Sequence, residues 1–202
     1  MNSSSTPFGN TSISFEVSKT PQHLTKSKEP LHIQYEVFES PLGDLLAAQS
    51  PLGLCYLGFV DAASILKSSG EEDLIAKELK SRFPHATFTR ATLHLQEKLP
   101  FFPQTKEQVA PLCLHLIGTS FQIRVWEQLL QIPFGKTTSY SAIAKRAGAS
   151  KAQRAVGSAI GKNPISILVP CHRVLRSDGK LGGYYWGLAK KEEVLRWEAT
   201  QF

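Results

Sequence analysis

Cysteine and methionine are scarce in this sequence. Its 202 residues hold one methionine and three cysteines, Cys55, Cys113 and Cys171, which are spaced 58 residues apart in each case. That spacing fits neither a disulfide framework nor a zinc site, and none of the six histidines pairs with a cysteine at finger-like spacing. We therefore expect no bound metal and a reduced, intracellular compartment.

Long apolar runs are also missing. No stretch is long and apolar enough to cross a bilayer, so we expect no membrane association. The N-terminus has no basic segment leading into an apolar one, which argues against a secretory signal.

Acidic residues become rare in the second half of the chain. Residues 1–117 hold 10 Lys/Arg and 12 Asp/Glu, a net charge of −2, whereas residues 118–202 hold 13 and 5, a net charge of +8. A basic half joined to a near-neutral half indicates a surface that binds a polyanion such as nucleic acid. Ordinary solvated lysines would give the same count, so charge alone leaves both interpretations open.

The first 117 residues predict a tail followed by a small α/β lobe. Residues 1–30 are rich in Ser, Thr, Pro and Lys, which favours a disordered tail. Residues 71–83 carry apolar side chains at helical spacing, and residues 111–118 alternate like a strand. Between the tail and the helix, turn sequences separate three runs that predict a small antiparallel sheet; the runs are 33–39, 44–50 and 54–60.

Residues 118–202 predict a helical lobe, so the chain as a whole is expected to be an α+β protein with lobes at 31–117 and 118–202. A capping box, Thr119 with Gln122, precedes a helix that ends near residue 132. Two short helical segments, 139–148 and 151–163, are joined at "GAS", where Ser150 is placed to cap the second. We interpret this pair as a helix-turn-helix. Two helices that merely pack together would have the same pattern. A last helix is expected over residues 188–199.

Cys171 stands between a proline and a histidine, and three roles are open to it: packed thiol, metal ligand or nucleophile. A nucleophilic cysteine needs a neighbouring base or positive charge, because the thiolate is the reactive form. His172 follows directly, and a histidine is a better base when an acid holds its other nitrogen. Glu198 is the nearest candidate acid downstream, with Glu192 and Glu193 as alternatives. From chemistry alone, a reactive Cys171 and a buried structural thiol both remain open.

The segment "NPISILVPCHRVLRSDGKLGGYYWGLAKKEEVLRWE" resembles the active-site region of the O6-alkylguanine-DNA alkyltransferase family. The family motif Pro-Cys-His-Arg stands here at residues 170–173. Upstream, "GTSFQIRVWEQLLQIPFGKTTSYSAIAKRAG" and "KAQRAVGSAIGKNP" match the family's helices in order and spacing. The resemblance is close over residues 118–199 and weaker over 31–117.

That resemblance implies roles for individual residues. Cys171 corresponds to the alkyl acceptor, His172 to a base that acts through water, and Glu198 to the acid that orients it. Asn163 corresponds to the asparagine that links the helix pair to the active-site segment, and Tyr140 to the tyrosine near the target nucleotide.

The resemblance also implies a pocket and a DNA surface. Val174 and Tyr185 match positions whose backbone contacts the guanine, and Tyr184 matches the aromatic pocket wall, with Trp186 next to it. Arg154 matches the arginine that enters the base stack when the target base leaves. The other residues expected at the DNA are Lys151, Ala152, Gly157, Lys162 and Ser177.

The implied activity is repair of DNA by irreversible transfer of an alkyl group, mainly methyl, from O6-alkylguanine to Cys171. O4-methylthymine is an expected second substrate. The family binds duplex DNA through the minor groove with little sequence preference and flips the base out. A single-turnover monomer without a cofactor is therefore expected, in the cytoplasm or, in a eukaryote, the nucleus. Two rival classes remain: a DNA-binding regulator with a buried Cys171, and a Cys-His hydrolase.

Trp186 stands where the family also has small residues, and a bulky ring there would narrow the pocket. We expect methylguanine to react well and benzylguanine poorly, and Trp186→Gly to reduce that difference. The rates at which the two lesions inactivate each protein test this. Equal rate ratios in the wild type and the variant would contradict it.

Overall fold

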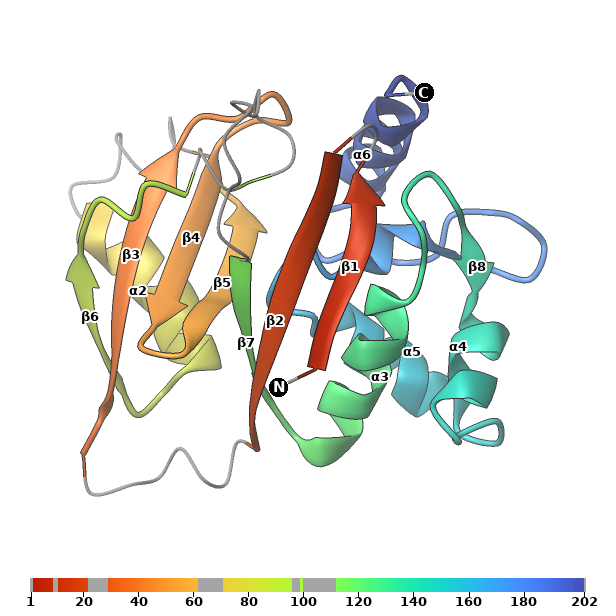
Figure 1. The fold of residues 1–202 in the computed structure, drawn as a ribbon, viewed down its shortest axis with the longest axis horizontal. Helices are drawn as coiled ribbons and strands as arrows, with labels where there is room; N and C mark the ends of the chain where they lie inside the picture. Colours follow the sequence, from red (N-terminus) through yellow and green to blue (C-terminus); the bar gives the residue numbers. More distant parts are fainter. Residues whose placement is uncertain are drawn as a thin grey trace.

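The computed structural model describes residues 2–8, 11–21, 29–61, 71–95, 99 and 112–201. Its main feature is a seven-stranded mixed sheet with the strand order β1-β2-β7-β5-β4-β3-β6 (Figure 1). The strands are β1 (Asn2–Phe8), β2 (Thr11–Pro21), β3 (Leu31–Phe38), β4 (Leu45–Ser50), β5 (Gly53–Phe59), β6 (Ala86–Arg90) and β7 (Leu112–Gly118). The helices are α2 (Glu71–Arg82), α3 (Ser120–Leu130), α4 (Tyr140–Arg146), α5 (Gln153–Gly161) and α6 (Leu188–Ala199). The protein is therefore of the mixed α and β class, as expected.

The predicted antiparallel sheet forms the middle of this larger sheet. β3 pairs with β4 and β4 with β5, both antiparallel, and each connection contains one of the SPLG turns. In the first turn, Gly43 has a φ of 101°, a left-handed conformation that glycine adopts without steric cost. β6 and β7 extend the sheet by parallel pairing with β3 and β5, which local sequence patterns do not predict.

Each face of the sheet is covered by its own apolar core. On one face α2 contributes Ile75, Leu79 and Phe83, and it crosses behind β3, β4 and β5 in Figure 1. On the other face, residues of α3, α4 and α5 pack with the alternate side chains of β4, β5 and β7. The alternation of buried residues to opposite faces is the direct result of the two-residue period of a strand.

The N-terminal segment differs from its prediction as a disordered tail. β1 and β2 occupy most of it, and β2 pairs in parallel with β7 from Phe15–Leu112 to Pro21–Gly118. The Ser- and Thr-rich composition suggested disorder, but residues 13, 15 and 17 are apolar and alternate, and β7 offers a partner edge to β2 from residue 15 onward. Residues 22–28 of the predicted tail lie outside the described residues.

The C-terminal helices agree with the sequence except at one cap. The Thr119–Gln122 capping box is present at the start of α3, and α6 has the predicted bounds. α5 begins two residues later than expected, with Ala152 rather than Ser150 before its first turn and no side-chain cap. Among the described helices, none has the length and apolar character needed to span a bilayer.

A short stretch before the Cys-His motif connects the helical part to the sheet. Leu57 of β5 donates its N–H to Pro164 O (2.9 Å) and accepts from Ser166 N (2.7 Å), as a parallel bridge between Leu57 and Ile165. Lys190 of α6 adds a second link through Leu42 O at 2.9 Å. The segment that leads to Cys171 is thus anchored on the central strand of the sheet.

Gly118, at the end of β7, tests how tightly α3 packs on the sheet. A Cβ at this position would lie 2.6 Å from two ring atoms of the buried Trp126. We expect Gly118→Ala to lower the free energy of unfolding by about 1–3 kcal/mol through overpacking, with a Tm drop of roughly 3–10 °C. Gly161→Ala is the control, because its Cβ would have no described neighbour within 4 Å. Equal Tm values for the two variants would contradict the prediction.

Candidate active site

Cys171 begins a single 3-10 turn, Cys171–Arg173, that leads into the two-residue strand β9 (Val174–Leu175). The turn is held by β9, which pairs in parallel with β8 (Thr138–Ser139) in front of α4. Cys171 is only 5% exposed, so a reacting group must enter a pocket to reach the sulfur.

Asn163 links the end of α5 to the active-site turn through its side-chain amide. Its Nδ2 lies 2.7 Å from Val169 O and 3.2 Å from Cys171 Sγ, and its Oδ1 accepts from Ile165 N at 3.0 Å. The side chain is buried, so these hydrogen bonds are not exchanged for water. Asn163 therefore links the end of α5 to the backbone and sulfur of the active-site turn.

His172, Arg173 and Glu198 form a buried charged cluster. His172 Nε2 lies 2.8 Å from Glu198 Oε1, and Arg173 reaches the same carboxylate through Nη2 at 2.7 Å and Nε at 3.0 Å. Arg173 Nη1 donates to Ile132 O at 2.7 Å. All three side chains are at most 1% exposed. The opposite charges of Arg173 and Glu198 balance, which makes burial of both tolerable.

The cluster leaves His172 suited to accept a proton. Burial lowers the pKa of His172 below its ordinary value, although the Glu198 carboxylate opposes this, so the imidazole is neutral near pH 7. Burial by itself would raise the pKa of Glu198, but its hydrogen bonds and charges with His172 and Arg173 hold it below the ordinary value. Nδ1 of His172 is buried and has no hydrogen-bond partner among the described residues.

Lys191 of α6 is a second charged group at the site, and the sequence did not predict it. Its ammonium is fully buried and donates to Val174 O at 2.7 Å and to Gly182 O at 3.4 Å. Burial lowers the pKa of Lys191 to about 8, and the charge that Cys171 carries as a thiolate opposes that shift. Only its position about two helical turns before Glu198, on the same face of the same helix, could have pointed to it.

The thiol itself is protonated in the resting site. Burial raises the pKa of Cys171, while the Asn163 amide and the Lys191 charge act to lower it. The residues around the sulfur therefore favour the thiolate, and burial opposes it. Removal of the thiol proton needs a base, and His172 is adjacent in the chain.

The pocket above Cys171 has an aromatic wall. It is lined by Ile160, Gly161, Asn163, Cys171, Gly183, Tyr184, Tyr185 and Trp186. Tyr184 is held by a 2.7 Å hydrogen bond between its hydroxyl and Ser166 Oγ. Trp186 is also one of the residues that line this pocket.

Tyr140, the first residue of α4, lies against Gly182 and Gly183 of the loop before α6. Its hydroxyl donates to Gly183 O at 3.3 Å, and a Cβ on Gly182 would lie 2.5 Å from the Tyr140 ring. Glycine at position 182 is therefore required by the close approach of this ring. Burial, and then the charge of Cys171, raise the pKa of Tyr140, so its hydroxyl stays protonated.

The residues predicted to contact DNA lie on or beside α5, apart from Ser177. Arg154, Lys151 and Lys162 are exposed, whereas Ala152 and Gly157 are half-buried. Ser177 is exposed on the turn after β9, which is closed by a hydrogen bond between Arg176 N and Lys180 O. The two alternative acids, Glu192 and Glu193, form exposed ion pairs with Arg196 and Lys190 and do not reach His172.

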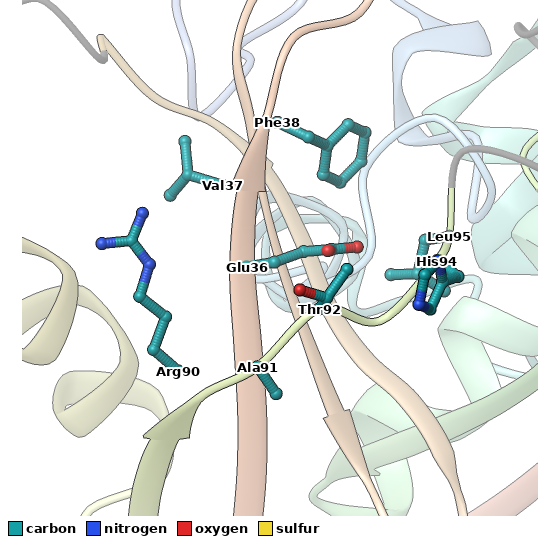
Figure 2. A pocket seen from close by; sticks show the side chains of 8 residues that line it. All are labelled: Glu36, Val37, Phe38, Arg90, Ala91, Thr92, His94 and Leu95. Carbon is teal, nitrogen blue, oxygen red and sulfur yellow. The ribbon is translucent and has the colours of Figure 1, made fainter.

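A second hollow lies between β3 and the segment that follows β6 (Figure 2). Glu36 and His94 are among its lining residues, and it shares none with the Cys171 pocket. Glu36 Oε2 accepts from Leu93 N at 2.9 Å. Within the described residues, no group of three His, Cys, Asp or Glu side chains is arranged to hold a metal ion.

Comparisons with known proteins agree with this geometry. A family model described as the DNA binding domain of 6-O-methylguanine DNA methyltransferase matches residues 120–200. The methylated-DNA–protein-cysteine methyltransferase of Methanosarcina acetivorans is 40% identical over 169 residues, which are 82% of this chain and 98% of that protein. A crystal structure of the Mycobacterium tuberculosis relative in complex with DNA has a TM-score of 0.59 at 32% identity and covers 85% of this chain and 94% of that one.

The chain spans about half the length of the first curated relatives it matches. The bifunctional transcriptional activator/DNA repair enzyme Ada of Escherichia coli is 38% identical over 184 residues, which are 89% of this chain but 49% of that protein. This chain therefore spans about half the length of that relative. The fold, the site and the near-complete match to the Methanosarcina protein show that the chain belongs to the methylated-DNA–protein-cysteine methyltransferase family.

Lys191 gives a test of the electrostatics at the sulfur. We expect Lys191→Met to slow the reaction of Cys171 with iodoacetamide by roughly tenfold near neutral pH, because a neighbouring positive charge that favours the thiolate is lost. Lys190→Met is the matched control, since Lys190 bonds to Leu42 O and Glu193 instead. Reaction rates from intact mass, measured over about pH 6 to 10, compare the two. The prediction fails if both variants react alike.

Proposed function

We propose that this protein repairs alkylated DNA by moving the alkyl group of O6-alkylguanine, mainly methyl, onto Cys171. The observation that carries the proposal is the arrangement of a buried Cys171, held by Asn163, beside a His172–Glu198 pair. Family membership supports the same activity, because the Methanosarcina relative is named a methylated-DNA–protein-cysteine methyltransferase and the Escherichia coli relative a DNA repair enzyme. O4-methylthymine is proposed as a second substrate.

The reaction begins with removal of the thiol proton. A water molecule bridging Cys171 Sγ and His172 Nδ1 would carry this proton to the imidazole, because Nδ1 has no described protein partner and Nε2 is bound to Glu198. The imidazolium formed is stabilised by the Glu198 carboxylate, and the thiolate by Lys191. No cofactor takes part in these steps.

Transfer is a direct displacement at the alkyl carbon. The sulfur forms a bond to that carbon, the bond between the carbon and guanine O6 breaks, and the electron pair goes to the guanine. Tyr140 is placed to donate a proton to the leaving base, since its hydroxyl stays protonated near the turn. The thioether product has no route to hydrolysis at neutral pH, so each molecule acts once.

DNA recognition is proposed for the α4–α5 pair, used as a helix-turn-helix. Exposed Arg154 and Lys151 can contact phosphates, and the half-buried Ala152 and Gly157 allow close approach of the helix backbone to a groove. We propose minor-groove binding by a monomer with little sequence preference, a flipped target base, and Arg154 in the space it leaves. Cytoplasmic DNA, or nuclear DNA in a eukaryote, is the proposed location.

Intact-mass measurement tests the function. After incubation with duplex DNA that contains O6-methylguanine, we expect the protein to gain the mass of one CH2 group, located on Cys171. Cys171→Ser is expected to bind the same DNA without any gain in mass, because the serine hydroxyl is a far weaker nucleophile than a thiolate. DNA binding without an adduct in the wild type would indicate a regulator. Turnover of an ester or amide without a stable adduct would indicate a hydrolase.

A further inference from the structure

The aromatic wall of the pocket is tied to α2, which belongs to the other part of the chain. The Tyr185 hydroxyl lies 3.1 Å and 3.3 Å from the two carboxylate oxygens of Glu78. Glu78 also accepts from Tyr56 of β5 at 2.9 Å and from Arg82 Nε at 2.8 Å. One carboxylate thus joins the sheet, α2 and the loop that covers Cys171.

The ring of Tyr185 is held as well as its hydroxyl. The Arg82 guanidinium lies over this ring, 4.7 Å from its centroid, and over the Tyr56 ring at 5.2 Å. Trp186 follows with edge contacts to Tyr185 at 5.1 Å and to Phe59 of β5 at 5.7 Å. Although Tyr185 is 55% exposed, two kinds of interaction therefore fix its position.

We propose that Glu78 is a positioning residue, which holds Tyr185 against α2 and so sets the size of the alkyl group that can reach Cys171. The proposal rests on the proposed function in alkyl transfer. It assigns to α2 a part in lesion selection.

The position of Tyr185 between two neighbouring hollows explains how its contact with Glu78 sets the size of the alkyl group that fits the Cys171 pocket. Tyr185 and Gly161 line both the Cys171 pocket and a neighbouring hollow of about 350 Å3, which also borders Arg82 and Lys162. Tyr185 therefore forms part of the partition between two spaces. Release of its hydroxyl from Glu78 would let the ring swing toward the hollow and lengthen the pocket.

The loop has little rigidity of its own. Gly182, Gly183 and Gly187 surround the three aromatic residues, and Gly187 has a φ of 89°. Glu78 is a suitable anchor because Arg82 keeps it ionised: burial would raise its pKa, but the hydrogen bond and charge of Arg82 hold it below the ordinary value. Hydrogen bonds to an ionised acceptor are stronger than those between neutral groups.

Tyr56 provides a matched control. Its hydroxyl donates to the same Glu78 oxygen, but the side chain is buried in the core under α2 and lines neither hollow. Tyr185→Phe and Tyr56→Phe each remove one hydroxyl from the same carboxylate. Only the first should release the pocket wall.

The experiment compares these variants with the wild type in two measurements. In Tyr185→Phe, hydrogen exchange of the backbone amides of residues 182–187 is expected to accelerate about fivefold or more. This is the size expected for loss of one hydrogen bond to a charged group at a partly exposed site. In Tyr56→Phe, the exchange rates of the same amides are expected to stay unchanged. The ratio of benzylguanine to methylguanine transfer rates is expected to rise by a similar factor in Tyr185→Phe alone. Glu78→Gln keeps an acceptor oxygen. Its exchange rates and its ratio of transfer rates should therefore lie between those of the wild type and those of Glu78→Ala.

Unchanged exchange in Tyr185→Phe would overturn the proposal, as would faster exchange with an unchanged ratio of transfer rates. A ratio that rises equally in Tyr56→Phe would assign the effect to general loosening of α2 and overturn it too. Hydrogen exchange is measured without DNA, so it tests the anchor even if the wild type transfers no alkyl group. In that case the proposed function fails while the exchange result still stands.

Discussion

The buried carboxylate of Glu198 is the constraint on which the rest of the site depends. It is the only acid that the described structure places within hydrogen-bond distance of both His172 and Arg173, and it also accepts from Gly135 N at 3.3 Å. Removing it would leave a buried guanidinium without its counter-charge, which is among the costliest changes a protein interior can undergo. Through this one group, α6 fixes the Cys-His turn and the loop before β8.

The same cluster explains why a reactive thiol can remain intact until it is needed. Burial keeps Cys171 protonated, and only 5% of it is exposed, so the sulfur is protected from general reaction with solvent molecules. The groups that favour the thiolate are already in place as Asn163, Lys191 and the neutral His172. A site of this kind fits the proposed transfer, in which the nucleophile is consumed once.

The sheet contributes to the chemistry indirectly. The bridge between Leu57 and Ile165 sets the path of the chain toward Cys171, and Glu78 on α2 holds the opposite wall through Tyr185. The pocket is therefore built from both parts of the chain, although its reacting groups all come from the C-terminal part. The proposed role of Glu78 therefore places a determinant of pocket size on α2, away from the sulfur.

The sequence by itself determined the local features: the capping box and start of α3, the bounds of α6, the three central strands, and the residues of the Cys-His motif. Such features follow from backbone sterics and side-chain periodicity within one element. Only the tertiary structure decided that β2 pairs with β7, that Lys191 is buried beside Cys171, and that Tyr185 meets Glu78 across 107 residues of chain. These contacts depend on which surfaces pack together. Packing is a property of the whole fold, so the pattern within one helix or strand does not predict it.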